Sequence, residues 1–171
     1  VPLRESLSGQ FGLIPHWSRD AGIGRRTYNA RSETVAEKPS FRDAWKNAQH
    51  CIIPVDAFFE PDWRSGKAVA TRIAAADGLP LGIAGLWALW QSPKGPVYSF
   101  TMLTINADGH PLMQRFHKPE DEKRSVVILP EDAWGDWLRA KSECSARSLN
   151  SSNLRLIRKN QAPSQRSTKR P

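Results

Sequence analysis

The sequence predicts an α+β fold with a largely antiparallel sheet, barrel-like or bifurcated, flanked by short helices. Apolar runs of strand length recur along the chain, and turns containing Gly and Pro separate several of them. Segments with helical periodicity are few, and they do not alternate strictly with the strands. This pattern favours an α+β protein, because a parallel α/β sheet needs a helix between successive strands.

The expected strands lie, in chain order, at residues 11–15, 50–60, 68–75, 82–90, 97–105 and 125–129. The first strand ends at Pro15, and the second is interrupted by Pro54 and Asp56. Turn sequences between the later strands occupy residues 76–80, 92–96 and 106–111. His110 is expected to be a turn residue in the last of these.

Two helices are expected in the body of the chain. The first covers residues 40–48 and can be capped by Ser40. Its apolar face consists of Phe41, Ala44, Trp45 and Ala48. The second follows Pro130. Its apolar face consists of Ala133, Trp134, Trp137 and Leu138. Ser32 can also cap a short helix that starts at Glu33.

The net charge of +8 lies almost entirely at the end of the chain. Residues 141–171 carry eight Lys or Arg and one acid, whereas residues 1–140 carry 17 basic and 16 acidic groups. We therefore expect one domain over residues 1–140 and a basic, mostly disordered tail over residues 141–171, with a short helix near residues 152–160. We interpret the tail as a solvated appendage in preference to a dedicated DNA arm.

Several classes of protein are not indicated. No apolar run is long enough for a bilayer, and no charged-then-apolar leader opens the chain. The two cysteines, Cys51 and Cys144, do not form a disulfide framework, so we expect a cytoplasmic protein. Scattered histidines and lone cysteines supply no ligand pattern, and no metal or cofactor is expected.

Glu60 and His117 are candidates for proton transfer. Glu60 follows two phenylalanines at a strand end, where desolvation should raise the pKa of its carboxyl. His117 lies before the last strand and can act as an acid, a base or an anion ligand. The alternatives are a glutamate that faces water and an ordinary loop histidine.

Asn29 and Arg31 are candidates for binding a phosphate or a base edge. They alternate around Ala30, so in an extended segment their side chains leave the same face. An amide beside a guanidinium suits either ligand. Arg25 and Arg26 add local positive charge upstream. A capped loop is the alternative interpretation, and it leaves both side chains free.

Three stretches of the chain resemble the SOS response-associated peptidase (SRAP) family when taken together and in order. They are FGLIPHW, YNARSETVAEKPSFRDAWKNAQHCIIPVDAFFE and HKPEDEKRSVVILPEDAWGDWL. The family includes proteins that crosslink to abasic sites in single-stranded DNA, so the resemblance implies a DNA-repair enzyme of the SOS response. Its implied reaction joins an N-terminal cysteine to the ring-opened sugar as a thiazolidine, with associated autoproteolytic peptidase activity.

The resemblance implies catalytic roles for Asn29, Glu60 and His117, with Arg31 on the DNA. The expected DNA-binding residues are Arg25, Arg26, Arg31, Trp17, Trp63 and Arg124, where arginines contact phosphates and tryptophans stack on bases. The implied partner is single-stranded or junction DNA with abasic sites. The protein is expected to be a monomer in the bacterial cytosol, associated with the nucleoid and without a membrane contact.

The sequence departs from the family pattern in two places. It begins Val1-Pro2-Leu3, so the implied nucleophilic cysteine is absent from this chain, and we expect it on an upstream segment. Pro61 stands where relatives commonly have Trp, which weakens base stacking there. Cys51 lies in an apolar run and is expected to be a buried structural thiol. A non-catalytic single-strand or junction binder is the alternative function, and a conventional protease is less favoured.

Overall fold

A computed structural model describes residues 5–141 and 158–159 of the chain. In chain order, the elements are β1 (Gln10–Phe11), η1 (Ala21–Arg26), β2 (Asn29–Arg31), α1 (Arg42–Lys46), β3 (His50–Val55), β4 (Phe58–Asp62), β5 (Val69–Ala74), β6 (Leu81–Ser92), β7 (Gly95–Asn106), η2 (Met113–Arg115), β8 (Arg124–Val126), β9 (Ile128–Leu129), η3 (Glu131–Ala133), α2 (Trp134–Arg139) and β10 (Arg158–Lys159).

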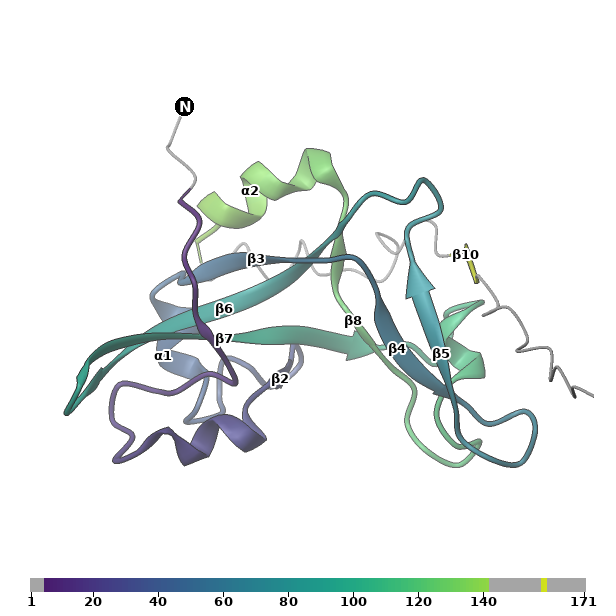
Figure 1. The fold of residues 1–171 in the computed structure, drawn as a ribbon, viewed down its shortest axis with the longest axis horizontal. Coiled ribbons are helices and arrows are strands. Elements are labelled where there is room, and N and C mark those ends of the chain that lie inside the picture. Colours follow the sequence, from purple (N-terminus) through teal and green to yellow (C-terminus); the bar gives the residue numbers. More distant parts are fainter. Residues whose placement is uncertain (1–4, 142–157, 160–171) are drawn as a thin grey trace, which may run out of the picture.

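The predicted α+β fold is confirmed, and its sheet is bifurcated and not closed into a barrel (Figure 1). The larger sheet runs in the order β1-β7-β6-β3, with β2 and β8 also on β7 and with β9 on β6. A smaller sheet has the order β10-β5-β4. Most neighbours are antiparallel, whereas β1 and β2 run parallel to β7.

The larger sheet divides into two arms where β6 and β7 stop pairing with each other. Their pairing ends at Gly85 and Met102, and the segment with β8 and β9 fills the space beyond. Val127 joins both arms, because its N–H donates to the Leu103 carbonyl and its carbonyl accepts from the Ala84 N–H, each at 2.9 Å. The single strand predicted over residues 125–129 is therefore split into β8 and β9, since each half pairs with a different arm.

The main core lies against β6 and holds both α-helices. The Trp137 indole of α2 is 1% exposed and donates to the Cys51 carbonyl of β3 at 2.9 Å. Trp45 of α1 is also buried in this cluster. Trp134 and Leu138 pack against it, so the apolar face predicted for the second helix is confirmed at Trp134, Trp137 and Leu138. A smaller cluster beneath β4 and β5 contains Ile73, Met113 and Phe116.

The predicted strand over residues 11–15 is wrong beyond Phe11. Gly12 has a φ of +101°, and a Cβ there would lie 2.1 Å from the Gly24 carbonyl oxygen, so the chain turns away from β7. Ile14 then donates its N–H to the side-chain hydroxyl of Ser99 on β7 at 2.8 Å and not to a backbone carbonyl of that strand.

The helix predicted over residues 40–48 is shorter in the structure. It spans Arg42–Lys46, Phe41 occupies the N-cap position, and the cap makes no side-chain hydrogen bond, so the expected Ser40 cap is wrong. Phe41, Ala44 and Trp45 are nonetheless buried as predicted. Ala48 has left the helix, with a φ of 52°.

Three further local predictions need correction. Successive turns replace the helix expected to start at Glu33. Pro54 does not interrupt β3, which runs through it and ends at Val55. In the tail, the helix expected near residues 152–160 is contradicted at Arg158–Lys159, which pair with β5 as a strand. Residues 142–157 and 160–171 of the tail lie outside the described residues.

His110 is a turn residue, as predicted. Its Nδ1 accepts the N–H groups of Leu112 and Met113 at 3.2 and 3.0 Å.

Over residues 5–141 and 158–159, no helix has the length and apolar character needed to cross a membrane.

Candidate active site

Glu60 lies on β4 with its side chain turned toward the protein. The side chain is only 14% exposed, whereas that of Phe59 beside it is exposed. Phe58, on the same face of the strand, packs against the cluster beneath the smaller sheet and against a second cluster that contains Ile83 and Ile128 of the larger sheet. Burial raises the pKa of the Glu60 carboxyl to about 7. The predicted direction of this shift is confirmed, and the group can exchange a proton near neutral pH.

His117 meets Glu60 across a backbone contact between distant segments. Its Nε2 lies 3.3 Å from a carboxyl oxygen of Glu60. Two backbone contacts hold the segments together. Phe116 forms an isolated antiparallel β-bridge with Asp62, and the His117 N–H donates to the Pro61 carbonyl at 3.0 Å. His117 has a φ of 64°, in the left-handed region that non-glycine residues rarely adopt. Glu60 was predicted at the end of a strand but lies in the middle of β4, and its carboxyl and the loop imidazole of His117 form one pair.

The His117 ring also faces the backbone of β8. Its Nε2 lies 3.3 Å from the carbonyl oxygen of Arg124, which can only accept a hydrogen bond. This contact favours a tautomer with the hydrogen on Nε2. The single hydrogen on Nε2 is then shared between the Arg124 carbonyl and Glu60, 3.3 Å from each. This separation is slightly longer than the range of about 2.6–3.2 Å typical of proton transfer, as is common before a substrate binds.

Asn29 and Arg31 are exposed on β2, and Ala30 between them is fully buried, which confirms the predicted alternation. In the register of β2 with β7, Asn29 pairs with Met102 and Arg31 pairs with Thr104. Arg31 Nη1 lies 2.8 Å from a carboxyl oxygen of Glu122. No contact between Asn29 and the Glu60–His117 pair is described.

Arg124 is directed into the protein. Its side chain is 14% exposed. The guanidinium donates to Glu33 at 2.9 and 3.0 Å, to Glu122 at 2.9 Å, and to the carbonyl and hydroxyl of Thr104 at 2.8 and 3.0 Å. Burial lowers the pKa of Arg124, but the bonds to Glu33 and Glu122 outweigh it and raise the pKa overall. Arg124 thus links Glu33 and Glu122, and its role as a phosphate ligand stays a prediction.

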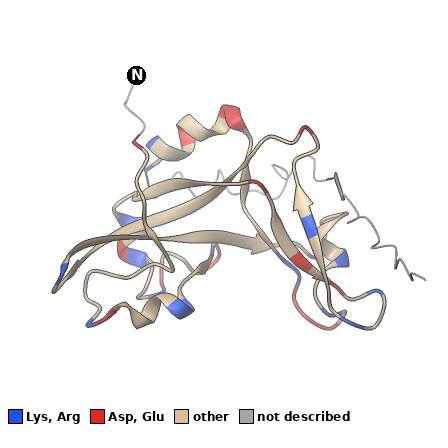
Figure 2. Ribbon diagram, in the orientation of Figure 1, with Lys and Arg blue, Asp and Glu red and all other residues tan. Residues whose placement is uncertain are grey.

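The remaining predicted DNA-binding residues lie in three places. Arg25 and Arg26 are exposed at the end of η1, in the last turn, and no ion pair of theirs is found in the described part of the chain. Figure 2 shows basic segments there and in the loops near β4 and β8. Trp63 follows β4, and the Lys118 ammonium sits 5.1 Å from its ring centre.

Trp17 lies on a different part of the surface. It is 48% exposed in the loop after β1. The next residue, Ser18, accepts the Trp90 indole N–H at 2.7 Å, which ties this loop to the end of β6 near the β6–β7 hairpin. No described contact links Trp17 to Glu60 or His117.

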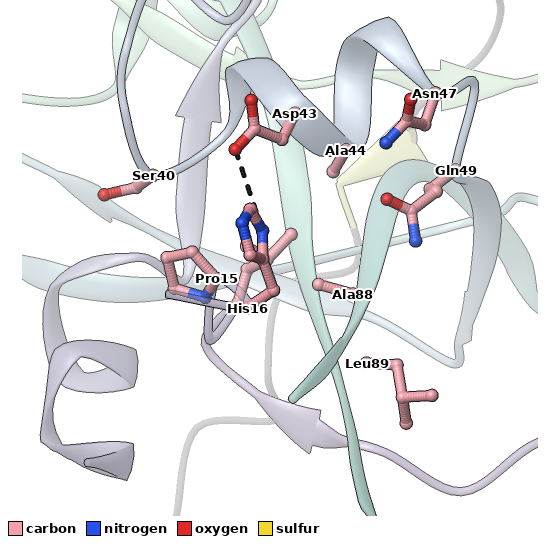
Figure 3. A pocket seen from close by; sticks show the side chains of 10 residues that line it. Pro15, His16, Ser40, Asp43, Ala44, Asn47, Gln49, Ala88 and Leu89 are labelled. Carbon is pink, nitrogen blue, oxygen red and sulfur yellow. Dashed lines mark ion pairs between the residues drawn. The ribbon is translucent and has the colours of Figure 1, made fainter. Parts of the chain in front are cut away.

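A shallow pocket of about 210 Å³ lies beside α1 and is separate from the Glu60–His117 pair (Figure 3). His16 and Asp43 face each other across it, with His16 Nδ1 3.7 Å from an Asp43 oxygen. None of the residues predicted for the site lines this pocket. Among the described residues, no cluster of His, Cys, Asp and Glu has a composition that could hold a metal.

Sequence reasoning missed the acids that organise the basic residues. Glu33 and Glu122 hold Arg31 and Arg124 in place, yet each belongs to a mixed-charge stretch that looks like an ordinary solvated loop. Pairing of β2 and β8 with the same strand, β7, is what brings them together. Sequence reasoning also missed Phe11 and Tyr28, two exposed aromatic residues whose ring centres are 6.1 Å apart.

Comparison with protein-family models gives a match to the SOS response associated peptidase (SRAP) family over residues 3–164. The chain is 36% identical over 135 residues to the abasic site processing protein YoqW of Bacillus subtilis. The aligned region covers 78% of this chain and 57% of YoqW. It is 26% identical over 127 residues to the abasic site processing protein HMCES of Gallus gallus, covering 61% and 38% of the two chains. The chain therefore spans little more than half the length of YoqW.

Solved structures resemble the fold. A crystal structure of a protein from Bordetella bronchiseptica matches with a TM-score of 0.80 and 47% identity, over 93% of this chain and 79% of that one. A protein from Bacteroides thetaiotaomicron matches with a TM-score of 0.70 over 84% and 64% of the two chains, and its 24% identity supports the fold alone.

Proposed function

The chain belongs to the SOS response-associated peptidase (SRAP) family, and from this premise we propose that it processes abasic sites in single-stranded DNA through a covalent DNA–protein crosslink. The observation that carries the proposal is the Glu60–His117 pair, an almost buried carboxyl with a pKa of about 7 that lies 3.3 Å from an imidazole. A pair with these properties suits the proton transfers of carbonyl chemistry.

The proposed reaction has two steps at the ring-opened sugar. A neutral amine attacks the aldehyde carbon, and the resulting carbinolamine loses water to give a Schiff base. A neighbouring thiolate then adds to the imine carbon and closes a thiazolidine. Glu60 gives a proton to the departing hydroxyl, which leaves as water, and His117 passes the proton released by the thiol back to Glu60. The same groups serve the autoproteolytic peptidase activity that exposes the nucleophile.

The proposal places the nucleophile on the family's N-terminal cysteine, which the 171 residues do not include. Cys51 does not suit this role. Its thiol is only partly accessible in β3, and burial raises its pKa to about 12, so it carries very little thiolate at neutral pH.

We assign DNA contacts to exposed residues on β2 and at the end of η1, and to Trp63 after β4. Asn29 holds the opened sugar or the amine, and Arg31 binds a backbone phosphate beside it. Arg25 and Arg26 extend the positive surface. Single-stranded DNA suits this arrangement because its backbone and bases are both accessible, and Trp63 offers a ring for stacking. The monomeric state and the nucleoid location stay predictions.

The test is adduct formation between the natural full-length protein and single-stranded DNA that carries one abasic site, resolved on a denaturing gel. We expect an adduct with abasic DNA and none with intact DNA. Glu60→Gln should slow its formation by about 10²- to 10⁴-fold, the usual contribution of an acid–base group. Glu37→Gln, at an exposed position in the turns after β2, is the matched control and should leave the rate unchanged.

The non-catalytic alternative predicts a different result. Arg25 and Arg26, exposed and without a described ion pair, favour salt-dependent binding whether or not chemistry follows. Equal affinity for intact and abasic DNA, with no adduct, would refute the crosslinking proposal and leave a single-strand or junction binder.

A further inference from the structure

Arg31, the residue assigned to a DNA phosphate, already has an anionic partner in the structure. Its Nη1 lies 2.8 Å from Glu122 Oε2, a separation typical of a charge-assisted hydrogen bond. We propose that the Glu122 carboxylate occupies the phosphate position on Arg31 and competes with the DNA backbone for it. This inference rests on the proposed function, because it concerns the same DNA contact.

Glu122 is held in place from several sides. Its other oxygen accepts from Arg124 at 2.9 Å and from the Asn106 amide at 3.4 Å. The next residue is anchored too, since the Lys123 N–H donates to Asp108 at 2.9 Å and its carbonyl accepts from Ala107 at 2.8 Å. The carboxylate therefore presents a fixed negative charge to Arg31. Figure 2 shows acidic and basic segments side by side in the loop that leads into β8.

The contact can also be exchanged. The Arg31 and Glu122 side chains are 59% and 38% exposed, and ion pairs at such positions are weak. If Arg31 turns to a phosphate, Glu122 keeps its bonds to Arg124 and Asn106, so no buried charge is left without a partner. The guanidinium meanwhile gains an anion that matches its planar fork.

Arg124, unlike Arg31, cannot exchange its partners easily. It is 14% exposed and bonded to Glu33, Glu122 and Thr104, so its release would leave several groups unpaired. The exchangeable cation of this network is therefore Arg31. Glu122 acts on DNA affinity through Arg31, which makes it a positioning residue and not a catalytic one.

The experiment is a double-mutant cycle read by fluorescence anisotropy with an intact, dye-labelled single-stranded oligonucleotide. Glu122→Gln and Arg31→Gln are made singly and together, and Kd is measured across a range of salt concentrations. Glu33→Gln is the matched control, because it removes the same charge from the same network but contacts Arg124 and not Arg31. Intact DNA keeps the result independent of crosslinking.

We expect Glu122→Gln to tighten binding about two- to fivefold, the range of an exposed ion pair, and to steepen the salt dependence. In the Arg31→Gln background the same change should have little effect, whereas Glu33→Gln should act equally in both backgrounds. Weaker binding by Glu122→Gln, or an effect that does not depend on Arg31, would overturn the proposal. No binding by the wild type, or no loss with Arg31→Gln, would refute the assigned DNA contact itself, and the competition with it.

Discussion

The substitution Glu60→Gln should stabilise the protein in alkaline solution while it slows the proposed crosslinking. Glutamine keeps the size and the hydrogen-bonding oxygen of the side chain, but it has no proton to lose. The wild-type carboxyl must ionise at high pH in a place that disfavours the charge, since only 14% of the side chain is exposed.

The magnitude follows from the raised pKa. The folded-state value is about 7, against an ordinary value of 4.5. Between these two pH values the folded protein binds more protons than the unfolded chain, so its stability falls as pH rises through the window. Each pH unit is worth about 1.4 kcal/mol, so the full loss is at most about 3 kcal/mol above pH 7. The Glu60→Gln variant has no carboxyl to ionise at this position, so it does not lose this stability.

The assay is urea denaturation of both proteins at several pH values from about 4 to about 8.5. The two free energies of unfolding should agree at the acidic end, and the variant should be more stable by about 2–3 kcal/mol at the alkaline end. Glu37→Gln, at an exposed position, should show no such divergence. A constant difference between Glu60→Gln and wild type across this range would refute the inference that burial controls the charge of Glu60.

Other predictions concern the fold and the free thiol. Gly12→Ala should destabilise by more than Gly66→Ala, because both have positive φ but only a Cβ at Gly12 meets backbone, 2.1 Å from the nearest oxygen; thermal melts of the two variants should differ, and equal melts would contradict the clash. Trp137→Phe should cost about 1–3 kcal/mol in urea titrations, because it removes the indole hydrogen bond to the Cys51 carbonyl and part of a buried ring; an unchanged midpoint would show that this bond adds nothing. With the other cysteine replaced by serine, Cys51 should react with iodoacetamide at pH 8 only after unfolding, since burial raises its pKa to about 12; rapid labelling of the native protein, followed by mass spectrometry, would disprove this.

The apolar patterns in the sequence predicted most of the strands and the faces of both helices. Residues 97–105, for example, lie within β7, and Trp137 is buried as its helical spacing requires. Local rules failed where a long-range contact decided the backbone. The segment after Phe11 leaves the sheet because Gly12 approaches Gly24, and no pattern within residues 11–15 contains that information.

The sequence by itself determined which kinds of chemistry the chain can offer. The apolar run before Glu60 predicted the direction of its pKa shift, although Phe59 proves to be exposed on the opposite face, and alternation around Ala30 predicted that Asn29 and Arg31 share a face. These features depend on neighbours along the chain, which a sequence displays directly.

Only the tertiary structure decided which groups meet. The 3.3 Å contact between Glu60 and His117 depends on a bridge between β4 and the loop after η2. The pairing of Arg31 with Glu122 joins residues 91 positions apart, because β2 and β8 both flank β7. Such contacts arise from the register of strands that are distant in sequence, and register is fixed by packing across the whole sheet.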